Sequence, residues 1–366
     1  MSSAADIDTF GPRDTTEEAL RRYLDRLPGM AIAVVGDFFL DKYLVIDRAL
    51  SEVSLETGLE SYQVVAKRCS PGAAGTVTSN LRALGVGEVY AVGFIGDDGE
   101  GYELRRGLES TGVSTEFLLS RADCFTPTYT KPMLREAGVE RELERMDIKN
   151  RQPLQAATEV ELLGRLDACC ERVDAVIVAD QVQERNFGVV SDRVRARLGE
   201  LATRYPDKVF AVDSRTRIGE YQRLTLKPNR REAALALDPS WRGELDFAAA
   251  REVGLALSRR AARPVYVTLS EAGILLCVAS GAAGTGEPAG DVAVHVAGIP
   301  VPDPIDPVGA GDSTCAGIVS ARCAGATLAE AALVGNLVAS ITVQQLGTTG
   351  TASPAQVLAR YRALLT

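Results

Sequence analysis

The chain has 366 residues, of which 46% are hydrophobic and 24% charged, and its formal net charge is −9. This length and apolar content suffice for a large buried core, and the acidic balance argues against a nucleic-acid partner while allowing a local basic pocket for a small phosphate. No run of 18 apolar residues occurs and residues 1–28 are polar and acidic. We therefore expect no membrane span, no signal peptide and a cytoplasmic protein.

The cysteine and histidine content narrows the chemistry further. The seven cysteines form no C-x-x-C pair, and their odd number fits poorly with a disulfide framework, so we expect reduced and mostly buried thiols. The adjacent Cys169 and Cys170 are better explained by a packed helix end than by a redox pair. His295 is the only histidine, which argues against Ser-His-Asp and Cys-His nucleophiles and against His-based zinc sites.

The order of predicted elements indicates an α/β fold. Residues 1–29 form an extension that carries a helix over Glu17–Arg26. From Met30 onward, short runs of β-branched residues alternate with helical patterns, which predicts one domain over 30–366 with a mainly parallel sheet. The expected buried strands are 31–35, 89–92, 175–178, 209–212 and 265–268. The expected helices span about 73–85, 98–110, 155–171, 186–203, 246–260, 311–324 and 328–344.

Two segments, at about 42–67 and 124–147, interrupt this alternation with extended polar and apolar patterns. We expect them to form a small separate sheet that stands off the main one, with edge strands of the main sheet as the alternative. The glycine-rich stretch 280–286 precedes no helix and is interpreted as a hairpin connection. No Walker phosphate loop and no strand-linked G-x-G-x-x-G occurs, which argues against Walker-type ATPases and dinucleotide oxidoreductases.

The most informative stretch is Asp306-Pro307-Val308-Gly309-Ala310-Gly311-Asp312, which leads into a helix of small residues. Two glycines let successive backbone N–H groups point at one spot, and the positive end of the helix adds to that field. Such a spot binds an anion. A carboxylate placed beside it suggests a base for phosphoryl transfer to an alcohol. For the tetrapeptide G-A-G-D alone, an ordinary loop with an aspartate cap is the alternative.

This stretch resembles the C-terminal signature D-T-x-G-A-G-D of the PfkB (ribokinase-like) carbohydrate kinases, and six motifs follow that family's order between Met30 and about Thr351. In the family the last aspartate deprotonates the substrate hydroxyl and the G-A-G amides stabilise the transferring phosphoryl group. The resemblance implies that Asp312 is the base and that Gly309, Ala310 and Gly311 form the anion hole. It also implies a ribokinase-like three-layer α/β/α domain with a small β-sheet lid.

Two motifs concern the acceptor. Residues 36–41 most closely resemble the G-D-x-x-L-D-x-Y opening of the bacterial heptose 7-phosphate kinases, which implies that Asp41 holds sugar hydroxyls. Residues 71–78 resemble P-G-G-A-A-N-V-A, with Gly72 retained, Ala73 in place of the second glycine and Thr76 in place of the asparagine. Because these positions line the sugar site in the family, the changes leave the identity of the sugar open.

The lid offers two cations, Lys131 and Arg145, as candidates for holding a phosphate already present on the substrate. Solvated strand faces are the alternative for both. The strands 175–178 and 209–212 are followed by Asp180 and Asp213. We therefore expect these two acids at the edge of the main sheet where the carboxyl ends of the parallel strands meet.

Three further motifs concern the nucleotide and cations. Residues 227–232 resemble T-P-N-x-x-E, in which Asn229 and Glu232 face the same side of a first helical turn and suit a hydrated Mg²⁺. An isolated N-x-x-E is otherwise a plain helix start. Residues 267–273 resemble the V-T-x-G-x-x-G nucleotide loop, which implies ATP contacts from the following residues: Thr268, Ser270 in place of the first glycine, Gly273, and Asn336 on the adenine side. A potassium site at Asp306 and nearby carbonyls is a hypothesis drawn from several family members.

Together the motifs predict an ATP- and Mg²⁺-dependent kinase that phosphorylates a hydroxyl of a sugar or sugar phosphate, acts without nucleic-acid or membrane partners, and dimerises through its lid. A nucleoside kinase is the alternative within the enzymes. From a different class, a regulator on an inactive kinase scaffold is favoured by Ala73, Thr76 and Ser270 and opposed by the intact G-A-G-D.

Overall fold

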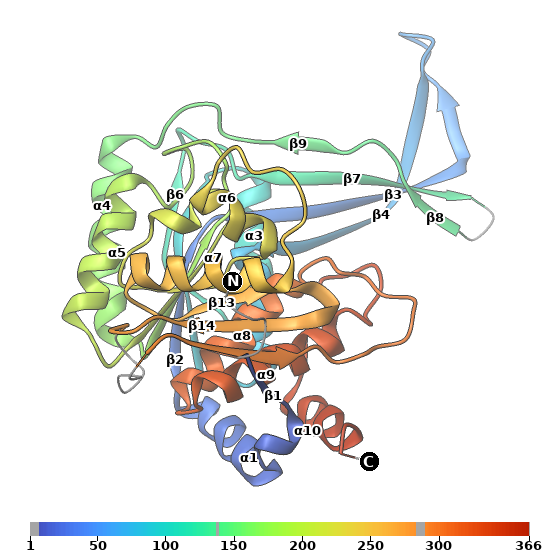
Figure 1. Cartoon of the computed structure of the whole chain (residues 1–366). Helices are drawn as coiled ribbons and strands as arrows, with labels where there is room; N and C mark the ends of the chain where they lie inside the picture. Colours follow the sequence, from blue (N-terminus) through green and yellow to red (C-terminus); the bar gives the residue numbers. More distant parts are fainter. Residues whose placement is uncertain (1–6, 137–138, 283–289, 366) are drawn as a thin grey trace.

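The computed structural model describes residues 7–136, 139–282 and 290–365. Within these ranges the main sheet has ten strands in the order β1-β15-β14-β13-β12-β11-β10-β2-β5-β6, and helices cover both of its faces (Figure 1). Neighbouring strands run parallel except where β14 pairs with β13 and β15. The predicted three-layer arrangement around a mainly parallel sheet is therefore confirmed.

The strands of the main sheet include all five that the sequence predicts. Their β-branched runs are buried between two helical layers, which explains why they are apolar throughout instead of alternating. The strands are β1 Asp8–Phe10, β2 Ala31–Gly36, β5 Glu88–Gly96, β6 Ser114–Arg121, β10 Ala175–Asp180, β11 Val209–Ser214, β12 Thr225–Leu226, β13 Val265–Thr268, β14 Gly273–Val278 and β15 Val292–Ala297.

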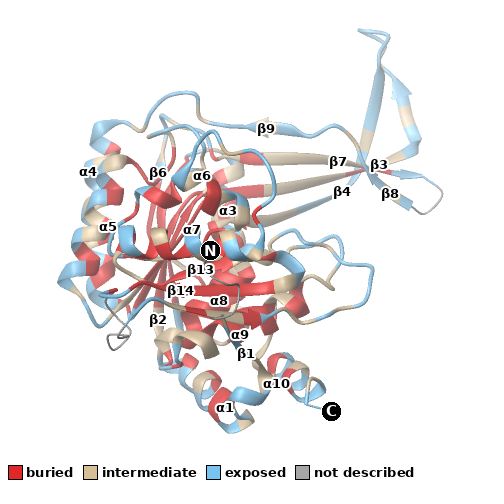
Figure 2. Ribbon diagram, viewed as in Figure 1, coloured by how far each residue is buried: buried red, intermediate tan, exposed pale blue. Residues whose placement is uncertain are grey.

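The helices divide into two layers, each with its own buried cluster, visible as the red interior of Figure 2. One layer contains α2 Ala74–Ala83, α3 Gly99–Ser110, α8 Ala310–Cys323 and α9 Leu328–Thr342. The other contains α4 Ala156–Arg172, α5 Asp192–Arg204, α6 Arg230–Leu237 and α7 Phe247–Ala261. All seven helices predicted after residue 30 are present. The helix expected from 186 begins only at Asp192, because the Ser191 hydroxyl accepts the N–H of Val194 and caps it there.

The N-terminal segment packs onto the body of the domain. Helix α1 occupies Glu17–Arg26 as predicted, and β1 adds a parallel strand beside β15. Leu20 and Leu24 of α1 are buried in the same cluster as α8 and α9. The Tyr361 hydroxyl of α10, Pro354–Ala363, lies 2.9 Å from the carbonyl of Pro12 and 3.0 Å from that of Thr15. The first and last helices thus lie close together at the bottom of Figure 1.

The second sheet stands off the main one (Figure 1), so the alternative of edge strands is wrong. Its order is β4-β3-β7-β8, with β9 also pairing with β7. The strands are β3 Phe38–Val53, β4 Glu60–Ala73, β7 Thr128–Glu136, β8 Val139–Glu142 and β9 Met146–Ile148. Strands β3 and β4 are longer than the predicted 42–67 segment, because β3 starts in the buried core and runs outward into solvent, and β4 returns from solvent to the core (Figure 2).

The remaining expectations concern thiols, a hairpin and membranes. All seven cysteines are free, and Cys169 and Cys170 are buried at the end of α4, which fits a packed helix end. The predicted hairpin exists as β14 and β15, although 283–289 in its connection lie outside the described residues. Across the described ranges, no helix combines the length and the apolar character that crossing a membrane requires.

Candidate active site

The carboxyl ends of parallel strands bring charged residues to one edge of the main sheet. Asp37 directly follows β2, Asp180 ends β10, Asp213 lies near the end of β11, and Lys227 directly follows β12. Since open α/β sheets bind ligands at this edge, it is the expected place for a site. Asp180, however, is only 1% exposed and is fully engaged in the interior. Its oxygens contact Arg217 at 2.7 Å, the Ser214 hydroxyl at 2.6 Å and the Tyr221 hydroxyl at 2.9 Å.

The predicted anion loop forms the start of helix α8. Gly309 is the N-cap residue with φ of +80°, a left-handed conformation that favours glycine, and no side chain caps the helix there. The N–H groups of the first turn, including those of Gly311 and Asp312, therefore lack an intrahelical acceptor. A methyl group of the buried Thr76 lies next to Gly309, because a Cβ on that glycine would be 3.3 Å from Thr76 Cγ2.

Asp312 is half-buried in the first turn of α8. Burial raises the pKa of its carboxyl to about 7, and the negative charge of Asp213 adds to this effect. Lys227 and Arg215 act in the opposite direction, and the charge of Asp41 again raises the pKa. Asp41 and Asp213 are thus the two acids whose charges act on Asp312.

Lys227 is a site residue that the sequence analysis quoted but did not select. Its side chain is 5% exposed, and its Nζ lies 2.9 Å from Asp213 Oδ2. A Cβ on Gly311 would be 3.6 Å from the same Nζ, so a buried ammonium lies beside the anion loop. Burial alone would lower the pKa of Lys227, but the attraction of Asp213 outweighs it and the pKa is raised. One feature of the sequence could have identified Lys227 as a candidate site residue. It directly follows a strand and stands where the family motif has threonine.

Asp41 and Lys131 form an ion pair where the lid meets the main sheet. Lys131 Nζ lies 3.0 Å from Asp41 Oδ1 and 3.1 Å from the Tyr43 hydroxyl, and both charged side chains are about 15% exposed. The interpretation of Lys131 as a solvated strand face is therefore wrong. Gly72 makes room for the pair, since a Cβ at this position would be only 2.4 Å from Asp41 Oδ2.

Arg145, the other candidate cation of the lid, is also paired. Its guanidinium contacts both carboxylate oxygens of Asp147, at 2.6 and 2.9 Å, and stacks over the Tyr129 ring at 4.3 Å from the centroid. The side chain remains 45% exposed.

Two substitutions relative to the family motifs adopt backbone conformations that suit glycine. Ala73 has φ of +53° at the start of α2, and Ser270 has φ of +56° in the turn after β13. A side chain at such positions adds strain. Ala73 and Ser270 thus keep the positive φ that glycine would adopt at these positions of the family motifs.

Asn229 and Glu232 form a reciprocal capping box at the start of α6. Asn229 Oδ1 accepts the Glu232 N–H and Glu232 Oε2 accepts the Asn229 N–H, both at 2.9 Å. The plain helix start considered from sequence is thus present. Burial and the charge of Asp213 also raise the pKa of Glu232 to about 6, so this acid belongs electrostatically to the same cluster as Asp312.

The predicted nucleotide loop lies next to this helix start. Thr268 pairs with Asn229 in a short parallel bridge, and its hydroxyl approaches the Pro228 carbonyl at 3.5 Å. Gly273 has φ of +91° and packs so tightly that a Cβ would lie 2.3 Å from the carbonyl oxygen of Val296. Asn336 ties α9 to β15, because its side-chain NH₂ donates to the carbonyls of Val296 and Ala297 at 3.1 and 3.0 Å.

Asp306 joins the two segments that the potassium hypothesis requires. Its carboxylate accepts the N–H of Val308 at 3.0 Å and that of Gly347 at 3.1 Å, and its own N–H donates to the Val343 carbonyl at 2.7 Å. Among the described residues, no group of three or more His, Cys, Asp and Glu side chains is arranged to hold a metal ion directly.

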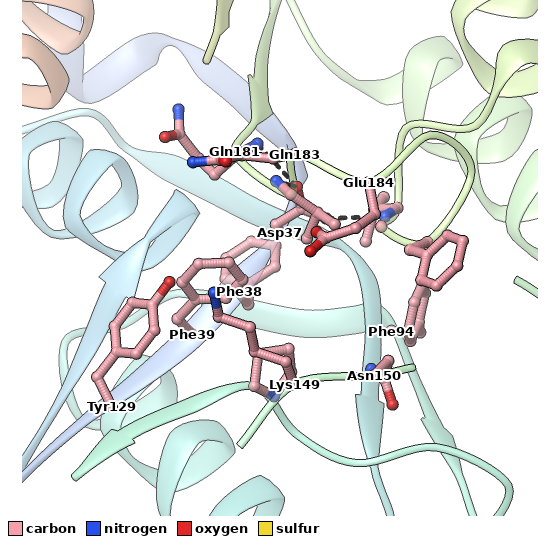
Figure 3. Close-up of a pocket in the computed structure, with 15 residues that line it drawn as sticks. Asp37, Phe38, Phe39, Phe94, Tyr129, Lys149, Asn150, Gln181, Gln183 and Glu184 are labelled. Carbon is pink, nitrogen blue, oxygen red and sulfur yellow. Dashed lines mark hydrogen bonds between the residues drawn. The ribbon is translucent and has the colours of Figure 1, made fainter. Parts of the chain in front are cut away.

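A pocket that opens to solvent lies between the lid strands β3 and β7 and the loop after β10 (Figure 3). One wall is held by Asp37, whose buried carboxylate accepts the N–H groups of Gln181, Val182 and Val189, each at 2.8 Å. Burial, and next the charge of Asp180, raise the pKa of Asp37 to about 6. Asp37 lies within the 36–41 motif, but the sequence did not predict that it fixes the loop from 181 to 189.

Several known proteins are similar to this chain. The curated relatives include the Bifunctional protein HldE of Citrifermentans bemidjiense and of Caulobacter vibrioides, which are 29% and 28% identical over 92% and 91% of this chain. The chain spans 64% of the length of each of these relatives.

Solved structures with the same fold include a ribokinase of Arabidopsis thaliana complexed with ribose and ATP, and phosphofructokinase-2 of Escherichia coli. Their TM-scores are 0.64 and 0.63, each is 17% identical, and the matches cover 91% and 92% of this chain and 99% and 100% of theirs. Residues 42–356 match the model of the pfkB family carbohydrate kinases. Because this match spans most of the sequence, the chain belongs to the pfkB family of carbohydrate kinases.

Proposed function

We propose that the protein transfers the terminal phosphoryl group of ATP to a hydroxyl of a sugar or sugar phosphate. The observation that carries this proposal is the start of α8, where backbone N–H groups without intrahelical acceptors lie beside the half-buried carboxylate of Asp312. A pKa of about 7 suits a group that must accept a proton near neutral pH. Lys227 adds a fixed positive charge beside the loop that Gly309, Ala310 and Gly311 form.

In this proposal each residue has a separate task. Asp41 accepts hydrogen bonds from sugar hydroxyls, and Gly72, Ala73, Thr76 and Lys131 complete the acceptor site. Asp312 takes the proton of the substrate hydroxyl. The oxygen of that hydroxyl bonds to the terminal phosphorus of ATP, and the bond between this phosphorus and the oxygen that leaves with ADP breaks. The N–H groups of the anion loop and the Lys227 ammonium stabilise the charge on the transferring group.

The nucleotide is assigned to the neighbouring turns. Thr268, Ser270 and Gly273 line the phosphates, with Asn336 toward the adenine. Mg²⁺, when bound, neutralises charge on the phosphates. Asn229 and Glu232 would hold it through water, which suits an ion that keeps much of its hydration shell. Burial and the charge of Asp213 raise the pKa of Glu232, and a cation held nearby would favour its ionised form.

Replacing Asp312 tests the base directly. We expect Asp312→Asn to lower kcat by roughly 10²- to 10⁴-fold, because the amide cannot accept the proton, while ATP binding is retained. Steady-state ADP release and calorimetric titration with ATP measure the two quantities. Near-normal turnover of this variant would remove Asp312 from the mechanism.

The pH profile tests the same residue without removing it. Since Asp312 must be ionised to act as base and its pKa is raised to about 7, kcat/KM should rise with pH through about 7. Lys227→Met should move this midpoint upward, because the positive charge of Lys227 favours the ionised carboxylate. The control is Lys67→Met on the lid, which should leave the midpoint in place. A midpoint unaffected by Lys227→Met would contradict the proposed electrostatic role.

A potassium requirement is the proposal for Asp306. The convergence of Asp306, Val343 and Gly347 supports it, because a cation bound there would order the loop that leads to Gly309. We expect activity with Mg²⁺-ATP to be higher in K⁺ than in a large organic cation at equal ionic strength. Equal rates in the two salts would exclude the site.

We also propose a homodimer formed through the lid. The outer parts of β3 and β4 and the connection between them stand away from the body of the domain and are largely exposed (Figure 2). The apolar residues exposed there are Leu50, Val53, Leu55, Leu59, Tyr62, Val64 and Val65. Val53→Asp should convert a dimer to a monomer in light scattering, whereas Val160→Asp on the exposed face of α4 should not. A wild-type protein that is monomeric at micromolar concentration would contradict this assembly.

The alternatives are separated by the same assays. A regulator on an inactive scaffold would bind sugars without releasing ADP from any of them. We place the protein in the cytoplasm, where ATP is available and where seven free thiols stay reduced.

A further inference from the structure

One cation at the carboxyl edge of the main sheet has no partner. Arg215 is exposed and directly follows β11, and within the ranges that the structure describes its guanidinium makes no hydrogen bond and no ion pair. Other cations of this region are each paired with a carboxylate. They are Lys131, Arg145, Arg217 and Lys227. Unlike them, Arg215 is left to bind an anion.

The backbone that carries Arg215 is held on both sides by buried ion pairs. On one side, Asp213 Oδ2 lies 2.9 Å from Lys227 Nζ. On the other side, Arg217 contacts Asp180 Oδ1 at 2.7 Å. The N–H of Arg215 itself donates to the Asp180 carbonyl at 3.0 Å, which extends the ladder between β10 and β11 by one hydrogen bond. Because this backbone is already fixed, only the side chain has to be ordered when a ligand binds.

Strand geometry directs Arg215 toward the anion loop. Successive residues of a strand point to opposite faces, so Arg215 shares a face with Asp213. The Asp213 carboxylate lies beside the loop, because a Cβ on Gly311 would be 3.9 Å from Asp213 Oδ2. Ser214, between the two charged residues, points the other way and donates to Asp180 Oδ2 at 2.6 Å.

The charge of Arg215 acts on the proposed base, on the proposed Mg²⁺ site and on the lid. Burial and the charge of Asp213 raise the pKa of Asp312 to about 7 and that of Glu232 to about 6, and Arg215 opposes both effects. Burial also raises the pKa of Tyr129 on β7, and Arg215 again acts in the opposite direction. Arg215 is thus close enough to influence groups assigned to the nucleotide side and to the acceptor side.

We propose that the Arg215 guanidinium binds the terminal phosphoryl group of ATP before and during its transfer. This group passes from the nucleotide side to the hydroxyl beside Asp312, so an unpaired cation whose charge acts on both sides suits it. The planar guanidinium can donate two parallel hydrogen bonds to two phosphoryl oxygens. The inference rests on the proposed kinase function and adds a catalytic residue to it.

The proton and the electrons of the transfer follow the course already proposed. Asp312 takes the hydroxyl proton, the bond between the acceptor oxygen and the terminal phosphorus forms, and the bond to the oxygen that leaves with ADP breaks. Arg215 keeps its protons and stabilises the charge on the phosphoryl oxygens by hydrogen bonds alone. A phosphate already carried by the acceptor has the same chemistry, and the choice of acceptors separates it from the transferring group.

Steady-state ADP release tests the inference with the full-length protein and Mg²⁺-ATP. The acceptors are ribose, adenosine, fructose 6-phosphate and heptose 7-phosphate. We expect Arg215→Met to lower kcat/KM by roughly 10²- to 10³-fold for every acceptor that the wild-type protein phosphorylates. A loss confined to acceptors that already carry a phosphate would overturn the inference.

A conservative variant separates the contact from the charge. Arg215→Lys keeps the positive charge but cannot form the two parallel hydrogen bonds. It should therefore lower kcat/KM while the midpoint of the pH profile stays in place. Arg260→Met is the matched control, because this exposed arginine ends α7 before β13 and so lies at the opposite edge of the sheet, and its kcat/KM should equal that of the wild type. Full activity of Arg215→Lys would contradict the contact.

Calorimetric titration decides the inference without turnover. The quantity is the ratio of the Kd for Mg²⁺-ADP to the Kd for Mg²⁺-ATP, which isolates the terminal phosphoryl group. Arg215→Met should lower this ratio by roughly 10- to 100-fold, as expected for hydrogen bonds to a charged group, and leave the Kd for Mg²⁺-ADP in place. An unchanged ratio overturns the role of Arg215 and leaves the kinase function standing. If no acceptor releases ADP, the proposed function fails by itself, and the ratio still decides the inference.

Discussion

The ion pair between Lys227 and Asp213 holds the site together. Asp213, Glu232 and Asp312 converge on the carboxyl edge of the sheet, and the charge of Asp213 raises the pKa of the other two. A buried ammonium 2.9 Å from Asp213 offsets this repulsion. Removing one partner of such a pair leaves a buried charge uncompensated, at a cost of about 3–5 kcal/mol. Lys227, which follows β12, and Arg215 both offset the repulsion among these acids.

The ion pair between Lys227 and Asp213 also influences the ionisation of Asp312. Burial alone would keep Asp312 protonated, and Asp213 acts in the same direction, whereas Lys227 and Arg215 favour the carboxylate. The resulting pKa of about 7 reflects a balance of opposing effects. Near neutral pH, such a carboxylate both accepts a proton and exists in ionised form. The N-terminus of α8 contributes in a second way, because its N–H groups favour negative charge on a ligand at the spot that Asp312 faces.

Much of this arrangement could be predicted from the sequence, because it depends on local patterns. The strands are apolar runs of the right length, and the G-A-G-D segment shows its turn and helix start in a few residues. The pair between Asp41 and Lys131 was not predictable in this way, since it depends on the parallel register of two lid strands about 90 residues apart. The importance of Lys227 was also hidden, because it depends on β11 and β12 lying side by side.

A short strand and two strained residues could not be predicted from the sequence for other physical reasons. Strand β1 has three residues and no hydrophobic period, and it is defined only by its pairing with β15. The positive φ values of Ala73 and Ser270 could be suspected only from the glycines at these positions in the family motifs. At Ala73 and at Ser270, tertiary structure overrides the preference of these residues for negative φ. Such strain is expected where the backbone is shaped for a ligand.

The two halves of the proposed site are built on different kinds of element. The proposed acceptor side lies on β3, one strand that runs from the buried Phe38 through Phe39 and Asp41 to the exposed end of the lid. The proposed nucleotide side lies on helix starts and turns, which include Asn229 and Ser270. A continuous strand fixes the spacing between Asp41 and Phe39, whose ring lines the neighbouring pocket. Under the proposed function, β3 would therefore set how an acceptor held by Asp41 presents its hydroxyl to Asp312.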